Sequence, residues 1–244
     1  MTTQELHNEF KITLDKVDSE SYPSFLEGEV DYFLNEAQDR FIKTRYGRNN
    51  AYSAGFEEMQ KRTDDLKALV VSRFCDITPV EYYGSTSDTV FRADLDSLFT
   101  DEDQSIVAPE KYMFYLKSTV NTCTDINKAC CGWFRVKLVQ QDDLSSVAND
   151  PFNKPKVEKP VIFFEDGDIF VWIGAEGIVE NFLVTFIRRP LAINLGTYGG
   201  SPQDCELSEY THKEIVQIAV RIALENIESP RQQSQEILNV RNQE

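Results

Sequence analysis

The run VIFFEDGDIFVWIG at residues 161–174 restricts the possible folds of this chain more than any other segment. Two stretches rich in β-branched and aromatic residues flank Asp166 and Gly167. An Asp-Gly pair between two such stretches favours a tight two-residue β-hairpin turn. Because a hairpin joins strands that run antiparallel, the sequence predicts antiparallel β-sheet.

Further strands are expected before and after this hairpin. Between Arg73 and about Val139, turn residues separate short runs rich in Val, Tyr, Phe and Thr. These runs are PVEYYG, TVFRADL, YMFYLKSTVNTC and GWFRVKLVQ. After the hairpin, NFLVTFIRRPLAINLG predicts one more strand, which Pro190 either ends or confines to a sheet edge. The segment QDDLSSVAND is expected to form a short helix.

Two helices are predicted before the strands. In the first, Ser24 with Glu27 three residues later has the pattern of a capping box, and Gly47 is expected to end the helix. Its apolar stripe comprises Leu26, Val30, Phe33, Ala37 and Phe41. The second helix is expected from roughly Gly55 to Val71, and the short connection GRNNAYS predicts an αα-hairpin.

A closing helix is predicted by ELSEYTHKEIVQIAVRIALENIESPR. Thr211 and Glu214 form a second capping-box pattern, and Pro230 is expected to end the helix. The apolar face comprises Ile215, Ile218, Ala219, Ile222 and Leu224. The sequence then continues to Glu244 and includes the amphiphilic run EILNV.

This order of elements predicts an α+β fold, in which an N-terminal helical hairpin and a C-terminal helix pack on a mostly antiparallel β domain. An extended C-terminal tail follows. Residues 1–244 are expected to form one domain. Its parts are a helical segment at 1–72, a β-rich segment at 73–205, the closing helix at 206–230 and the tail at 231–244.

The formal net charge of −16 argues against two classes of function, nucleic-acid binding and contact with an anionic membrane. Binding to nucleic acid or to an anionic membrane requires clustered Lys and Arg. No apolar run approaches the length of a membrane span, and MTTQELHNEF lacks the pattern of a signal peptide, so synthesis in the cytoplasm is expected. The five cysteines are odd in number and irregularly spaced, which favours reduced thiols.

A search for catalytic residues or cofactor ligands gives no candidate that we favour. His7 is expected in a mobile N-terminus and His212 on the surface near a helix cap, so neither suits a nucleophilic triad. The thiols of CTDINKACC, including Cys123, Cys130 and Cys131, lack the spacing of a zinc site. The carboxylates at 94–103, including Asp94 and Asp96, are interpreted as a solvated acidic loop. No enzyme, cofactor or metal site is predicted.

Four segments in order resemble the ring, or head–tail connector, proteins of short-tailed bacteriophages, most closely the crAss-like phages. They are FLNEAQDRFIKTRYG, NDPFNKP, FLVTFIRRPLAI and CELSEYTHKEIVQIAVRIALENIESPRQQSQ. The resemblance implies a structural subunit of a dodecameric ring next to the portal, in the neck or tail of the virion. It also implies partners, namely other copies of the chain, the portal and neighbouring ring and tail proteins. Genomic DNA would pass through the lumen without specific binding.

The C-terminal tail is the candidate partner-binding site. A closed ring needs two different contact surfaces on each subunit, and a tail laid across a neighbour supplies such a contact. The residues expected to make it are Pro230, Arg231, Ile237, Leu238 and Val240. A frayed C-terminus is the simpler interpretation of the same residues.

Two other functions remain open at this point. An acidic adaptor or nucleic-acid mimic would act as a monomer or dimer rather than as a ring. A carboxylate-metal hydrolase would depend on Asp94 and Asp96, and the sequence offers it little support.

Overall fold

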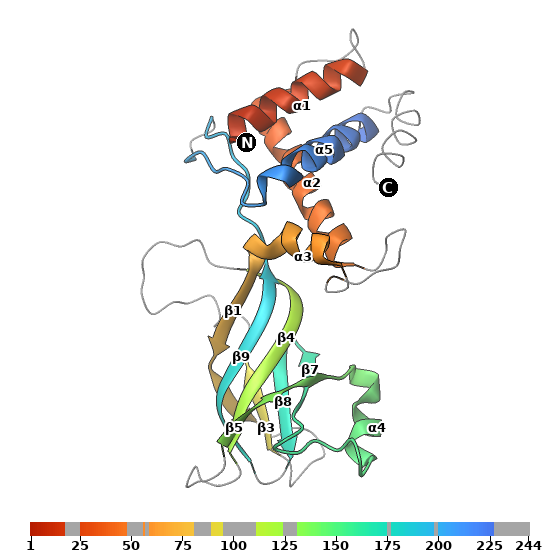
Figure 1. The fold of residues 1–244 in the computed structure, drawn as a ribbon, viewed down its shortest axis with the longest axis vertical. Coiled ribbons are helices and arrows are strands. Elements are labelled where there is room, and N and C mark those ends of the chain that lie inside the picture. The colour runs from red at the N-terminus through yellow and green to blue at the C-terminus, as the bar shows by residue number, and fades with distance from the viewer. Residues whose placement is uncertain are drawn as a thin grey trace. The chain divides into compact units, whose positions relative to one another are not determined.

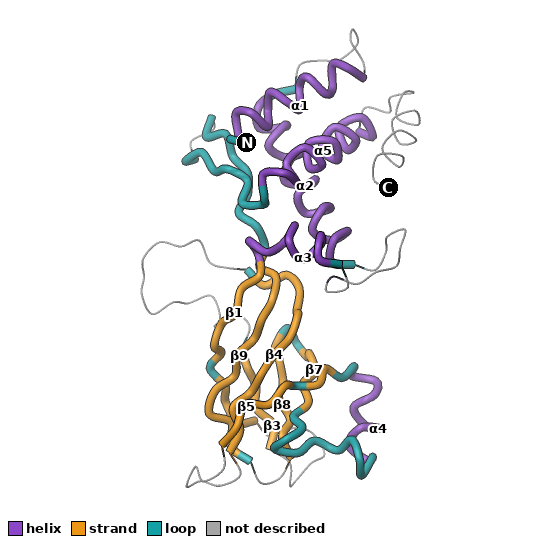
Figure 2. The backbone as a smooth tube through the Cα atoms, in the orientation of Figure 1, coloured by secondary structure: helices purple, strands orange, loops and turns teal. Residues whose placement is uncertain are grey.

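The computed structural model describes residues 1–17, 25–47, 56, 59–80, 89–94, 111–123, 131–174, 177–197 and 200–226. The chain divides into two compact units. One comprises Met1–Leu69 and Pro190–Glu244 and is here called the helical unit; the other comprises Val70–Arg189 and is called the β unit. Figure 2 shows that the named strands all belong to the β unit.

The helical unit is built around three helices (Figure 1): α1 (Thr3–Val17), α2 (Glu27–Tyr46) and α5 (His212–Asn226). Helix α5 contacts both α1 and α2. The expected apolar stripe of α2 is confirmed from Val30 to Phe41, whereas Leu26 is exposed. The core also includes Leu6, Phe10 and Leu14 of α1, because these side chains recur every four residues on one helical face.

The expectation of a mobile N-terminus is therefore wrong. The start of α1 is held to the segment before α5 by the Thr3 backbone N–H and hydroxyl, which donate to Asp204 Oδ1 at 2.6 and 2.7 Å. These bonds join residues far apart in the sequence, which a local pattern of residues does not reveal.

The N-cap of helix α2 is Leu26, two residues after the expected cap, and the helix begins at Glu27. The Glu29 carboxylate accepts a hydrogen bond from the Leu26 backbone N–H at 2.8 Å, and Glu27 accepts one from the Thr197 hydroxyl. Ser24 lies outside the described residues. The predicted end is confirmed, since the Gly47 N–H donates to the Lys43 carbonyl at 2.9 Å.

Helix α2 also binds the irregular segment that leads to α5. The Asn35 side chain donates to the Ile193 carbonyl at 2.9 Å and accepts from the Ile193 N–H at 2.7 Å. This pair satisfies both backbone groups of a buried residue, as a neighbouring strand would do.

The second predicted helix is shorter than expected. Helix α3 spans Gln60–Leu66, a 3-10 turn follows at Lys67–Leu69, and strand β1 begins at Val70. Val70 and Val71 pair with Ile187 and Phe186, so strand pairing overrides the helical pattern at these residues.

The closing helix is confirmed, but its predicted capping box is not. The Thr211 hydroxyl donates to the Ser208 carbonyl at 2.7 Å, and Glu214 accepts from Arg45. Ile215, Ala219, Ile222 and Leu224 are buried as predicted.

The β unit contains two sheets. Strands β1 (Val70–Cys75), β9 (Ile178–Arg188), β4 (Tyr112–Cys123) and β5 (Cys131–Arg135) form a four-stranded sheet in that order. The second sheet has the order β2 (Ile77–Val80), β3 (Thr89–Ala93), β8 (Asp168–Gly174), β7 (Val161–Glu165) and β6 (Lys137–Leu138). All named pairings are antiparallel except that of β6 with β7.

The Asp-Gly hairpin is confirmed as the turn between β7 and β8. Glu165 pairs with Asp168, and Asp166 and Gly167 have φ values of 51° and 88°. Positive φ at both central positions defines the type I′ turn that matches the twist of the strands.

One core cluster contains buried residues of both sheets, including Val120, Phe182 and Val184 from the first and Ile162, Val171 and Ile173 from the second. The opposite side of β8 carries Phe170 and Trp172, which pack with Leu144 and Ala148 of helix α4 (Leu144–Asn149). Strand β8 is therefore buried on both faces. The α+β fold class with mostly antiparallel sheets is confirmed.

Strand β9 pairs with both β1 and β4. Its last residue is Arg188, two residues before Pro190. Of the two predicted roles for Pro190, the structure supports the end of a central strand.

Candidate functional site

The predicted partner-binding residues Pro230, Arg231, Ile237, Leu238 and Val240 lie outside the described residues. The same holds for Asp96 and for the carboxylates at 101–103. Asp94 is described and is exposed at the end of β3. The structure therefore leaves the tail and the acidic loop as predictions.

Both histidines are buried within the helical unit. His7 Nε2 lies 2.7 Å from Asp31 Oδ1, and the His7 side chain is buried. His212 Nε2 donates to the Leu207 carbonyl at 2.9 Å, and burial lowers the pKa of His212 below its ordinary value. The expected surface position of His212 is wrong, because the residue faces the core of the helical unit.

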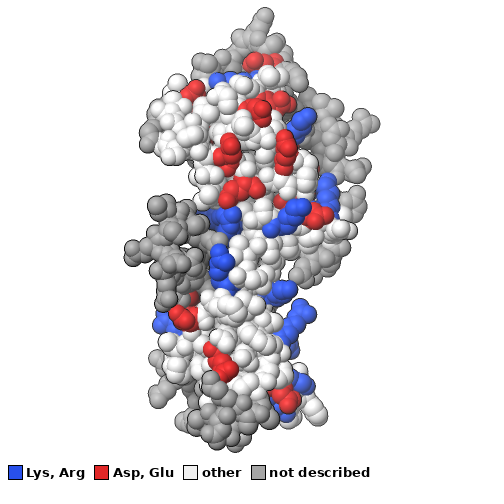
Figure 3. Space-filling view, turned by 60° about the vertical axis from the view of Figure 1, so that its left-hand side comes forward, with Lys and Arg blue, Asp and Glu red and all other residues white. Residues whose placement is uncertain are grey.

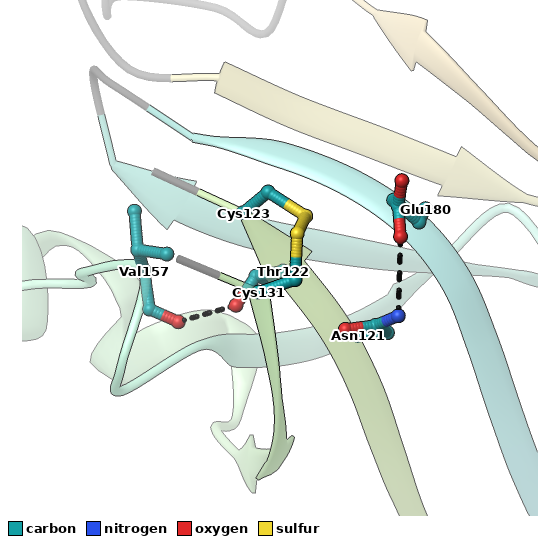
Figure 4. Close-up of a disulfide and its surroundings, with 6 residues drawn as sticks. All are labelled: Asn121, Thr122, Cys123, Cys131, Val157 and Glu180. Carbon is teal, nitrogen blue, oxygen red and sulfur yellow. Dashed lines mark hydrogen bonds between the residues drawn. A yellow bond between two sulfur atoms is a disulfide. The ribbon is translucent and has the colours of Figure 1, made fainter. Parts of the chain in front are cut away.

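Cys123 and Cys131 form a disulfide, drawn in Figure 4. They are directly opposite each other in the pairing of β4 with β5, with Cα atoms 4.2 Å apart. The expectation of reduced thiols is therefore wrong for this pair and confirmed for Cys75 and Cys205. Burial raises the pKa of Cys75 to about 12 and that of Cys205 to about 11, which makes both thiols poor nucleophiles.

Glu180 lies beside this disulfide. A carboxylate oxygen of Glu180 and the two sulfur atoms are all within 4.8 Å of one another. The Glu180 side chain accepts a hydrogen bond from Asn121 at 3.3 Å (Figure 4). While the sulfur atoms are bonded to each other, neither is a thiolate that could bind a metal ion.

A pocket of about 350 Å³ lies between α2 and α5. Phe41 and Ile218 supply apolar surface, and four cationic side chains line it: Arg40, Lys43, Arg45 and Arg221. Arg40 and Arg221 both contact Glu225, and Arg45 contacts Asp65 and Glu214. We interpret these ion pairs as contacts that hold the helices together.

The four-stranded sheet exposes apolar side chains on the side opposite the core cluster. Two rows of paired residues define this outer face: Phe74, Leu183, Thr119 and Arg135 in one, and Asn181, Asn121 and Trp133 in the next. Phe74 is 65% exposed and Trp133 is 53% exposed. Their ring centroids are 6.3 Å apart. Exposed aromatic residues that cluster in this way often mark protein–protein contact sites.

Within the described residues, this arrangement offers surfaces for assembly and no group of residues with an evident catalytic role. None of the described helices has the length and apolarity needed to cross a membrane. The exposed aromatic residues of the outer face fit a protein that acts through contacts with other proteins.

Comparison with known proteins identifies the family. The sequence profile of phage tail ring protein 3/4 matches residues 1–235. The chain belongs to this family. The chain is also similar to ring protein 4/5 of Bacteroides phage crAss001, with 22% identity over 239 residues that cover 91% of this chain and 92% of that protein.

Membership in the tail ring protein family confirms the resemblance to the ring proteins of crAss-like phages. It makes the chain a structural protein of the virion that assembles with other phage proteins. The family is one of structural proteins rather than of known enzymes.

Sequence reasoning missed two features of this ring protein. The disulfide depends on the register of β4 and β5, which places Cys131 opposite Cys123. The outer face depends on the order of the strands, since Phe74 and Trp133 come from opposite edges of the sheet. The period of two in a strand, which places Trp133 and Arg135 of β5 on one side, was the available sequence signal.

Proposed function

We propose that copies of this chain form a closed dodecameric ring in the neck or tail, which connects the portal to tail components. The match of the tail ring protein family to residues 1–235 carries this proposal. The ring would form part of the channel through which genomic DNA leaves the capsid.

The charge of the chain supports a passive role toward DNA. Each subunit carries a formal net charge of −16. Many such subunits around one axis would produce a negative potential that repels phosphate. DNA would then pass along the channel without a specific binding site.

We further propose that the tail after Ser229 reaches a neighbouring subunit or the portal, with Ile237, Leu238 and Val240 as apolar anchors. The polar run RQQSQE at residues 231–236 directly precedes this apolar group, and α5 ends at Asn226. An extended segment of this kind lengthens the contact between subunits without enlarging either folded unit.

The connection to the portal is tested by mixing the purified ring protein with the portal protein of the same phage. Electron micrographs are expected to show rings of twelvefold symmetry that stack on the portal along a common axis. An otherwise identical mixture with an unrelated phage's portal is the control. Rings that form but never stack on the cognate portal would contradict the proposed connection while leaving the ring itself intact.

A further inference from the structure

The outer face of the four-stranded sheet is chemically unlike the surface expected of an acidic protein. Its centre is aromatic and aliphatic, with Leu183 half-buried between Phe74 and Trp133. The two rings lean toward each other across β9 and β4, since their centroids are only 6.3 Å apart although they belong to the edge strands. Both rings remain exposed after this contact.

Basic side chains border one end of this apolar centre. Arg135 of β5 is paired with Thr119 of β4, and Lys117 lies two residues before Thr119 on β4. Both cationic side chains are exposed. At the other end, Glu180 is held by Asn121 beside the disulfide. The rest of the face within these two rows is uncharged. An apolar centre with a cationic border fits a partner that is apolar and acidic.

We propose that the outer face binds a second copy of this chain and is one of the two contact surfaces of each ring subunit. This inference rests on the proposed ring. A ring interface joins two different surfaces, so the neighbour must present a surface of complementary charge. Copies with a net charge of −16 repel one another overall, and the cationic border offsets that repulsion at the contact.

The chain carries a surface of the matching chemistry. On α2, Tyr32 is 62% exposed and lies between Glu29 and Glu36 on the same helical face. On the face of the molecule drawn in Figure 3, acidic side chains gather over the helical unit. An aromatic ring flanked by carboxylates complements aromatic rings flanked by Lys117 and Arg135. This complementarity favours a second copy over an unrelated partner.

Tryptophan fluorescence tests the contact in the wild-type ring. The sequence contains two tryptophans, Trp133 and Trp172, and Trp172 is only 6% exposed. In dilute, unassembled protein, acrylamide should quench Trp133 strongly. In the ring, quenching of Trp133 should fall several-fold, and a Trp133→Phe variant supplies the constant signal of Trp172. Rings in which Trp133 stays fully quenchable would overturn the inference.

Substitutions provide the second readout. Phe74→Ser and Trp133→Ser should each raise the concentration at which rings form by about tenfold or more, as expected for a central aromatic contact. Phe152→Ser removes a ring that is 84% exposed in the same unit and should change nothing. Arg135→Glu should weaken assembly, whereas Lys137→Glu, also exposed in the β unit, should not.

The outcomes separate this inference from the proposed ring. Thermal unfolding of each variant shows whether the subunit stays folded. If the wild type forms rings and folded outer-face variants form them equally well, the inference is wrong and the ring proposal stands. If the wild type forms no ring under any condition, the proposed ring fails, and this interface fails with it.

Discussion

Arg45→Met is expected to lower the free energy of unfolding by about 3–5 kcal/mol at neutral pH. Arg45 Nε lies 2.9 Å from Asp65 Oδ2, and the Asp65 side chain is only 1% exposed. Burial raises the pKa of Asp65, and the Arg45 guanidinium lowers it in part. Without Arg45, a buried carboxylate is left without its closest cation. Chemical denaturation followed by circular dichroism measures the loss.

The pH dependence of this loss identifies its cause. Removing Arg45 raises the pKa of Asp65 further, so the carboxyl becomes neutral at a higher pH. The loss of stability caused by Arg45→Met is complete above that pKa, where Asp65 is charged, and shrinks as the pH falls through it. The double variant Arg45→Met with Asp65→Asn should recover most of the stability.

Arg40→Met is the matched control. Arg40 lies on the same helix and contacts Glu36 and Glu225 at 3.5 Å, but its side chain is 41% exposed. Exposed ion pairs contribute little, so a loss below about 1 kcal/mol is expected. Equal losses for the two variants, or a loss that does not shrink in acid, would contradict a buried-charge penalty at Asp65.

Truncation after Ser229 is expected to abolish ring assembly and to leave the subunit folded. The tail would bury Ile237, Leu238 and Val240 on a neighbour, and burying one such side chain is worth roughly 1.5–3 kcal/mol. Because the losses of several anchors combine at each contact, no ring should form at concentrations at which the full chain is fully assembled. Sedimentation velocity measures assembly, and thermal unfolding measures folding.

Replacing Ile237, Leu238 and Val240 together with Ser should reproduce the truncation. Replacing Gln232, Gln233 and Gln235 with Ala tests whether any change in the tail has this effect, and it should leave assembly intact. Normal assembly of the truncated chain would make the C-terminus a frayed end without a partner.

Much of the fold follows from local patterns. The Asp-Gly turn, the stripe of α2 from Val30 to Phe41 and the buried face of α5 each combine a periodicity with a turn or end signal. Such features depend on residues close in sequence, and the structure confirms them. Helix α1 was missed although Leu6, Phe10 and Leu14 carry the same spacing, because its first turn is fixed by the distant Asp204 rather than by a local end signal.

The candidate site was less predictable for a physical reason. Which side of a strand faces the core depends on the sheets that form. In β1, Phe74 is exposed whereas its neighbour Cys75 is buried in the core. The pairing of Val70 with Ile187 overrode a helical pattern in the same way. The disulfide required the register of two strands, which a spacing of eight residues between Cys123 and Cys131 does not determine.

The central claim is that copies of this chain assemble around an axis, and mass measurement of the purified protein tests it most directly. Native mass spectrometry or mass photometry over a range of concentrations should show one large closed species, with ring-shaped projections in electron micrographs. The share of this species should rise with salt, because salt screens repulsion between subunits of charge −16. A mass that stays at 28.0 kDa at the highest concentrations, at every salt level, would contradict the account.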